Sequence, residues 1–249
     1  MTWHLQRKDV VDGDQLREML ADHPARAAQA IIGAAAAHDI EAQALLGQIL
    51  LDGKGIERDA RLAMVWFEIA ARNGHVMARN MLGRCHEHGW GCQADPAAAA
   101  SQYELAAAAG LDWALYNLGN LLATGRGVPC DQIRALHCYR QAAASGHAKS
   151  MNLLGRYLEE GLYCPRDLPA AYEWYQRSAH GGDFRGQFSH AAVLAEHGRI
   201  DEALTWLRRA LTHGNLNFLR VSRDALLQSA DPRIRALAQD YHSRALQLE

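Results

Sequence analysis

Apolar residues recur along most of the chain at intervals of three and four positions, with polar residues between them. Ala42, Leu46 and Leu50 show the spacing that places one apolar stripe along a helix. A second segment follows in which Ala63, Trp66-Phe67 and Ala70-Ala71 share a face at helical spacing. The pattern predicts paired helices, and hence an all-α chain.

The helix pair recurs with a fixed period. Its clearest marker is a leucine-glycine dipeptide in the first helix, whose glycines are 36 residues apart (83 − 47, 119 − 83 and 155 − 119). The same period governs a Gly-x-Gly pair, an aspartate, an aromatic pair and a closing glycine. In the first unit these are Gly53-x-Gly55, Asp59, Trp66-Phe67 and Gly74.

Each recurring position has a physical reason. A glycine inside a helix costs roughly 1 kcal/mol relative to alanine, so its fourfold recurrence at the Gly47 position predicts the close approach of another helix backbone. The Gly-x-Gly pair can end the first helix in the left-handed conformation. The aspartate can then cap the second helix, most clearly at Asp95-Pro96, where proline occupies the first helical position.

Two places depart from the pattern. Tyr163 replaces the second glycine of a Gly-x-Gly pair, so we expect that turn to be built differently. In a fifth unit His190 and Ala191 stand at the leucine-glycine positions. The loop after them is four residues shorter than in the other units. Four periods after Trp66 would place the equivalent residue at 210, whereas it is found as Trp206.

These spaced residues resemble the Sel1-like repeat, a relative of the tetratricopeptide repeat. The resemblance implies a right-handed α-α superhelix, a solenoid of helix pairs with helical caps. We expect a single domain over 1–249. Its predicted parts are N-terminal capping helices in 1–38 (over 13–20 and 24–37), four repeats in 39–183, a shortened fifth repeat in 184–214, and closing helices in 215–249 (over 216–229 and 232–248).

Composition narrows the function. The chain is 49% hydrophobic and 22% charged, as folded domains are, and its formal net charge of -2 argues against a bulk electrostatic nucleic-acid binder. Five cysteines at uneven spacing do not indicate a disulfide framework, the start does not resemble a signal peptide, and the apolar run 31–37 is too short for a membrane span. We expect a cytoplasmic protein, of bacterial style in its alanine and arginine content.

Stacked helix pairs form a concave face on which solenoids commonly bind partners. The resemblance implies that first helices line this face. The residues five and two before the leucine of Leu-Gly, and two, five and six after it, are therefore expected to be exposed there, as Leu51 is in the first unit. The hypothesis is a scaffold or adaptor that holds an extended, carboxylate-bearing segment of another protein. An ordinary solvated face is the alternative, with Trp113 packed between repeats. The candidate residues are Asn80, Arg84, Trp113, Tyr116, Asn120, Lys149, Asn152 and Arg156.

A second hypothesis is a small-ligand- or metal-responsive regulator that uses Cys85, His86, His88 and Cys92, which are metal-ligand types close in sequence. Against it, Cys85 falls on the apolar stripe and the spacing fits no zinc motif. The sequence carries no catalytic or cofactor-binding motif, so we expect neither an enzyme nor a cofactor. A third possibility is a subunit of a larger assembly, which exposed Phe218 and Tyr241 would favour.

Overall fold

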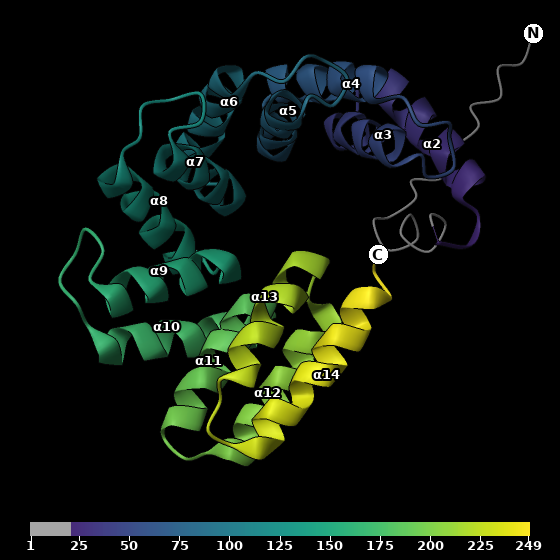
Figure 1. Cartoon of the computed structure of the whole chain (residues 1–249). Coiled ribbons are helices and arrows are strands. Elements are labelled where there is room, and N and C mark those ends of the chain that lie inside the picture. Colours follow the sequence, from purple (N-terminus) through teal and green to yellow (C-terminus); the bar gives the residue numbers. More distant parts are fainter. Residues whose placement is uncertain (1–20) are drawn as a thin grey trace, which may run out of the picture. The chain divides into compact units, whose positions relative to one another are not determined.

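The fold is taken from a computed structural model that describes residues 21–249, and the secondary-structure elements it describes there are all α-helices (Figure 1). The expected helix over 13–20 lies outside the described residues. The chain divides into two compact units, of which the first ends at Ala109 and the second spans Gly110–Glu249. The predicted all-α repeat fold is confirmed.

The first unit is a row of helices in which each packs on the next along the chain. Its core is built from residues such as Ile31, Leu50 and Phe67, all at most 2% exposed. The helix predicted over 24–37 is present as α2. The unit consists of α2 (Pro24–Ala36), α3 (Ile40–Asp52), α4 (Ala60–Arg72), α5 (Val76–His88) and α6 (Pro96–Ala108).

The second unit continues the helix pairs and ends in the two predicted closing helices. Phe218 and Tyr241 lie in its core, at 8% and 0% exposure, so these two residues do not form the exposed apolar patch that an assembly subunit would need. The unit consists of α7 (Asp112–Thr124), α8 (Gln132–Ala144), α9 (Ala148–Glu160), α10 (Leu168–His180), α11 (Phe184–Glu196), α12 (Ile200–His213), α13 (Leu216–Leu227) and α14 (Pro232–Leu246).

The predicted caps form. In each of the four regular units an aspartate accepts a backbone N–H of the second helix, as Asp59 does from Leu62 at 2.9 Å and Asp95 from Ala98 at 3.0 Å. The first helices of these units each end at a left-handed glycine, for example Gly53 with φ 69°. The local signals in the sequence therefore fix where the helices begin and end.

The helical glycine of each regular unit lies under an aromatic ring of the second helix. A β-carbon at Gly47 would stand 2.7 Å from Phe67 Cδ1 and 3.1 Å from the Ala63 carbonyl oxygen. A β-carbon added at the equivalent glycines would stand 2.6–2.7 Å from a ring carbon of Tyr103, Tyr139 or Tyr175. The prediction of a close approach is therefore right only in part: the nearest group is an aromatic ring, and a backbone carbonyl comes next at Gly47, Gly83 and Gly155.

The prediction that the turn at Tyr163 is built differently is wrong. Tyr163 has φ 55°, in the left-handed region that Gly55 (75°) and Gly91 (81°) occupy in their turns. The hydrogen bonding of the turn is also kept, because Leu162 N–H donates to the Tyr157 carbonyl at 2.9 Å as Trp90 N–H does to Cys85. The surrounding turn therefore imposes a conformation that a tyrosine adopts only at a cost of roughly 1–2 kcal/mol.

Replacing Tyr163 with glycine should stabilise the fold. We expect Tyr163→Gly to raise the free energy of unfolding by about 0.5–1 kcal/mol, because the relieved backbone conformation outweighs the greater freedom of glycine in the unfolded chain. The Tyr163 ring, at 61% exposure, contributes little packing. Urea denaturation measures the gain. Tyr163→Ala, which keeps a β-carbon, should show no such gain, and an equal gain there would contradict the explanation.

Candidate functional site

The eight candidate residues fall in different places. Two lie on α5 of the first unit and six on α7 and α9 of the second. Asn80 is only 2% exposed, so the expectation that it faces solvent is wrong. The equivalent residues Tyr116 and Asn152 are only partly buried, so helical register alone does not explain the burial of Asn80. Leu51, another expected face position, is also buried, at 8% exposure. Fewer residues of the first helices are therefore exposed than their offsets from the leucine of Leu-Gly predict.

In the first unit Arg84 lies over an aromatic ring. Its guanidinium carbon is 4.9 Å from the centre of Trp90, the residue between the two glycines of its turn. His88 stacks on the same indole at 4.8 Å. A guanidinium held on an indole face gains a cation–π attraction while its N–H groups can still reach a ligand.

In the second unit Trp113, Tyr116, His147 and Lys149 form an aromatic cluster. Trp113 and Tyr116 lie on α7, and the ring of His147 packs against both, with centres 4.6 and 4.8 Å away. The Lys149 ammonium lies 5.1 Å from the Trp113 ring and 5.9 Å from the Tyr116 ring. Trp113 packs between repeats, as the alternative expected, and also remains 41% exposed, so that it presents apolar surface to solvent.

The polar candidates of this unit differ in how far they are already engaged. Asn120 Oδ1 accepts the Tyr139 hydroxyl at 2.9 Å, and Asn152 Oδ1 accepts that of Ser189 at 2.9 Å. Each asparagine therefore uses its carbonyl inside the fold and has its amide nitrogen to donate. The Arg156 side chain is 55% exposed, with its Nε 3.9 Å from Glu160. Of the candidates on α9, Arg156 is the most accessible charge.

The sequence did not predict the role of His147. His147 caps α9, because its Nδ1 accepts the Ser150 backbone N–H at 3.3 Å. The same nitrogen lies 2.9 Å from the Ser150 hydroxyl. His75 caps α5 in the same way, and Asp39 and Asp183 cap their helices from the same register position. That shared register with two aspartates was the available signal. Burial lowers the pKa of His147, the nearby Asp112 opposes this, and Lys149 adds to it.

His147 makes the stability depend on pH. Its folded pKa is lowered, so on acidification the unfolded chain takes up the proton first, and the stability supplied by the neutral ring is full above about pH 6.5 and is lost as the pH falls toward the folded pKa. Asparagine at this position can cap without titrating. The melting temperature of wild type minus that of His147→Asn should fall between pH 7.5 and 5. A difference independent of pH would contradict the assignment.

The cysteine and histidine residues near the end of α5 do not converge on one point. Cys85 is fully buried, and burial together with the nearby Cys92 raises the pKa of its thiol to about 12. Cys92 Sγ lies 4.0 Å from His86 Nδ1, while His88 stacks on Trp90. Across residues 21–249 we find no group of three or more His, Cys, Asp or Glu side chains that could hold a metal ion. The metal-responsive alternative is not supported.

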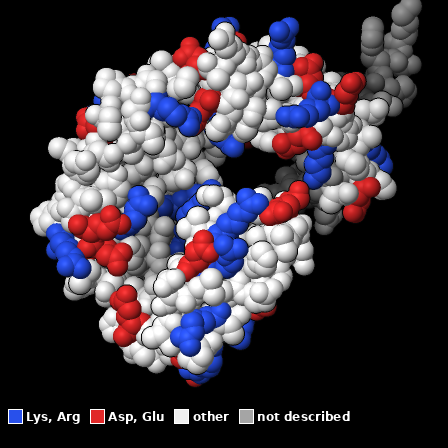
Figure 2. Space-filling model, viewed as in Figure 1, with Lys and Arg blue, Asp and Glu red and all other residues white. Residues whose placement is uncertain are grey.

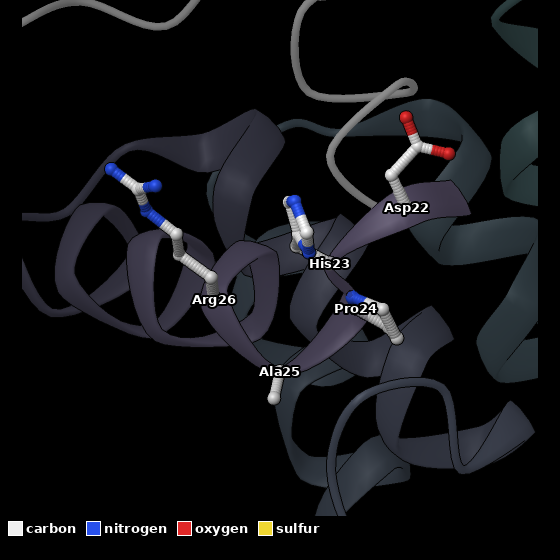
Figure 3. Close-up of a pocket in the computed structure, with 5 residues that line it drawn as sticks. All are labelled: Asp22, His23, Pro24, Ala25 and Arg26. Carbon is white, nitrogen blue, oxygen red and sulfur yellow. The ribbon is translucent and has the colours of Figure 1, made fainter.

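Two other features of the surface do not include the candidate partner-binding residues. A pocket of about 430 Å³ at the start of α2 is lined by consecutive residues, and Figure 3 shows its Asp22 and Arg26 side chains pointing in different directions. Figure 2 shows acidic and basic side chains interspersed on the visible face, in keeping with the net charge of -2. None of the helices within the described residues has the length and apolar character to cross a bilayer.

Three solved structures that are similar to this chain come from bacteria. A Sel1 repeat protein from Oxalobacter formigenes matches with a TM-score of 0.78 and 24% identity, over 96% of this chain and 100% of that one. A protective antigen of uropathogenic Escherichia coli matches with 0.69 and 22%, over 95% of this chain and 54% of its own. An immunity protein from Pseudomonas aeruginosa matches with 0.56 and 16%, over 84% and 81%. At these identities the likeness is one of fold.

The sequence comparison is more specific. None of the curated proteins matches this chain. The family model described as Sel1 repeat matches residues 40–75, 76–111, 114–147, 148–183 and 200–215, which together are more than half of the chain. The first four segments coincide with the four regular units read from the 36-residue period. The chain therefore belongs to the Sel1 repeat family.

Proposed function

We propose that the protein is a non-enzymatic scaffold that binds another protein, or an extended segment of one, on the face formed by α7 and α9. Sel1-repeat proteins are generally protein-interaction scaffolds. The observation that carries the proposal is the aromatic cluster on this face, which joins an exposed indole to a cation. Trp, Tyr and Arg are the residues that most often anchor protein interfaces.

The cluster suits an anchor because it is held in place before a partner arrives. The Trp113 indole packs edge-on against the buried ring of His147. Lys149 approaches the indole from α9, the first helix of the following unit. A side chain already ordered in the free protein loses less entropy on binding. An apolar side chain of the partner can cover the exposed 41% of Trp113 without reorganising it.

The polar residues of α9 are arranged to orient a bound partner segment along the helix. Lys149, Asn152 and Arg156 are spaced three and four residues apart, which places them along one face of the helix. Seven residues of helix rise about 10 Å, a length that about three residues of extended chain span. A segment with a carboxylate near each end can pair with Lys149 and Arg156 while the Asn152 amide nitrogen donates to its backbone. The proposed partner segment is therefore extended and acidic.

Further residues extend the proposal. Asn120 lies one turn beyond Tyr116 on α7 and offers a second amide donor. In the first unit Arg84, held over Trp90, provides a separate contact for the same or another partner. We place the protein in the cytoplasm, because an odd number of unevenly spaced cysteines suits a reducing compartment.

Affinity capture from native cytoplasmic extract tests the proposal. The test variant is Trp113→Ala/Arg156→Ala. The matched control is Trp174→Ala/Arg177→Ala, which removes another tryptophan and arginine, on α10, where Arg177 lies 4.2 Å from the Trp174 ring. Circular dichroism confirms that both are folded. We expect a partner that wild type and control retain and the test variant loses. Retention of that partner by the test variant would overturn the choice of face.

A further inference from the structure

The second unit contains a cavity of about 220 Å³ among its last four helices. α11 contributes Phe188, Ala191, Ala192 and Ala195, and these face Leu207 of α12 and Ile234 of α14. Ala192 and Ala225, which lies across the cavity on α13, are both exposed, so the cavity opens to solvent at this rim. It therefore forms a pocket that a small group can enter, which we call the C-terminal pocket.

The pocket lies where the fifth unit departs from the repeat. In the regular units the second helix places an aromatic ring, such as Phe67, against the helical glycine. In the fifth unit the ring position is Leu207 and the glycine position is Ala191, and both line the pocket. The unit therefore lacks the bulky ring that fills this part of the other four.

The neighbouring positions of α11 are also reduced in size. Ala192 stands at the position that Gln48, Arg84, Asn120 and Arg156 occupy in earlier units. Ala195 stands at the position that Leu51, Glu87, Ala123 and Glu159 occupy in those units. Two columns that carry mostly long side chains elsewhere thus end in methyl groups, and the closing helices pack over them without filling the space. The smaller side chains that create the pocket are therefore Leu207, Ala192 and Ala195, at three separate repeat positions.

The lining determines what the pocket can hold. It is formed by apolar side chains and one hydroxyl, that of Ser229, which accepts the Asp231 backbone N–H at 3.3 Å. No charged residue lines it, so a charged or strongly polar ligand would lose hydration without compensation. An apolar cavity of about 150 Å³ engineered in another protein binds benzene. A pocket of about 220 Å³ has room for one ring with a short substituent.

We propose that the C-terminal pocket binds a compact apolar ring group of the size of toluene. The ring of Phe188, which meets Phe218 edge-on at 5.8 Å, gives the ligand an aromatic wall held in place by the core. The group arrives as a free small molecule or as a phenylalanine-like side chain of another chain. The pocket lies outside the α7 and α9 face, so this proposal does not depend on the proposed function.

Thermal unfolding followed by circular dichroism tests the pocket with toluene and with N-acetylphenylalanine amide as probes. At ten times its dissociation constant, toluene should raise the melting temperature of wild type by about 2–6 °C. Ala192→Leu and Ala195→Leu each fill the pocket from α11 and should abolish the shift. Ala144→Leu, at an exposed position at the end of α8, should keep it.

The outcomes are distinct. A shift with toluene alone indicates a small-molecule pocket, and a shift with both probes indicates a pocket that accepts a side chain attached to a backbone; either supports the proposal when the filling variants lose it. The absence of a shift with both probes overturns it, as does an equal shift in wild type and the filling variants. If one filling variant does not fold, the other decides the result.

Discussion

Phe67→Ala should lower the free energy of unfolding by about 3–5 kcal/mol, the usual range for removing a buried phenylalanine ring. The Phe67 side chain is 1% exposed and lies in the core of the first unit. Its ring covers Gly47, which has no β-carbon to fill the space that the ring would leave. The cavity would form between two helices whose mutual packing defines the repeat unit, so little relaxation can close it.

Urea denaturation followed by circular dichroism measures this loss. Val65→Ala is the matched control, because Val65 lies on the same helix, is 44% exposed, and alanine is the better helix former. We expect the control to change stability by no more than about 0.5 kcal/mol. A loss below about 1 kcal/mol for Phe67→Ala would show that the ring does not hold the pair together.

Gly47→Ala should destabilise the protein by about 1–3 kcal/mol although it improves helix propensity. The added methyl would stand 2.7 Å from two ring carbons of Phe67 and 3.1 Å from the Ala63 carbonyl oxygen. The ring is enclosed by the core and the carbonyl belongs to a helix backbone, so neither can move without shifting α3 from α4. Overpacking of this kind outweighs the gain of roughly 1 kcal/mol from replacing a helical glycine.

The control for Gly47→Ala is Gly33→Ala on the neighbouring helix α2, where a β-carbon would meet no atom within 4 Å. That substitution should stabilise the protein by about 0.5–1 kcal/mol through helix propensity alone. In the Phe67→Ala background Gly47→Ala should lose most of its effect, because the two residues share one contact. Equal effects of Gly47→Ala in both backgrounds would contradict the steric explanation.

Much of this architecture could be predicted because the repeat encodes it locally. The aspartate caps and left-handed glycines are formed by residues within a few positions of each helix end, so the sequence states them directly. The repeat period and the apolar stripes then indicate which faces of the two helices pack together, as they do at Gly47 and Phe67. Repetition made the inference secure, because the same residues solve the same packing problem in each unit.

The failures have separate causes, and only that of Asn80 lies in groups distant in sequence. Asn80 was expected on the surface because its offset matched Tyr116, but burial depends on what packs against α5 and not on helical register alone. Tyr163 adopts a glycine conformation because the rest of its turn imposes it. The capping role of His147 requires its ring to turn toward its own backbone, which residue type does not reveal.

The C-terminal pocket also could not be predicted from the sequence. Ala192 and Ala195 depart from two repeat positions that carry mostly long side chains, but alanine on a helix is equally compatible with a filled core. The cavity arises because α13 and α14 cover these residues at a distance that no local pattern specifies. In the same way, the aromatic cluster forms because the start of α9 lies beside α7 and brings His147 to Trp113.

Site-specific photo-crosslinking tests the central claim, that the α7 and α9 face binds the partner, most directly. A benzoylphenylalanine introduced in place of Trp113 is compared with one in place of Trp174 on α10, in cells that contain the native partner. We expect a discrete crosslinked species from position 113 that is absent at position 174 and lost when Lys149→Ala/Arg156→Ala is added. A partner crosslinked from position 174 and not from 113 would contradict it.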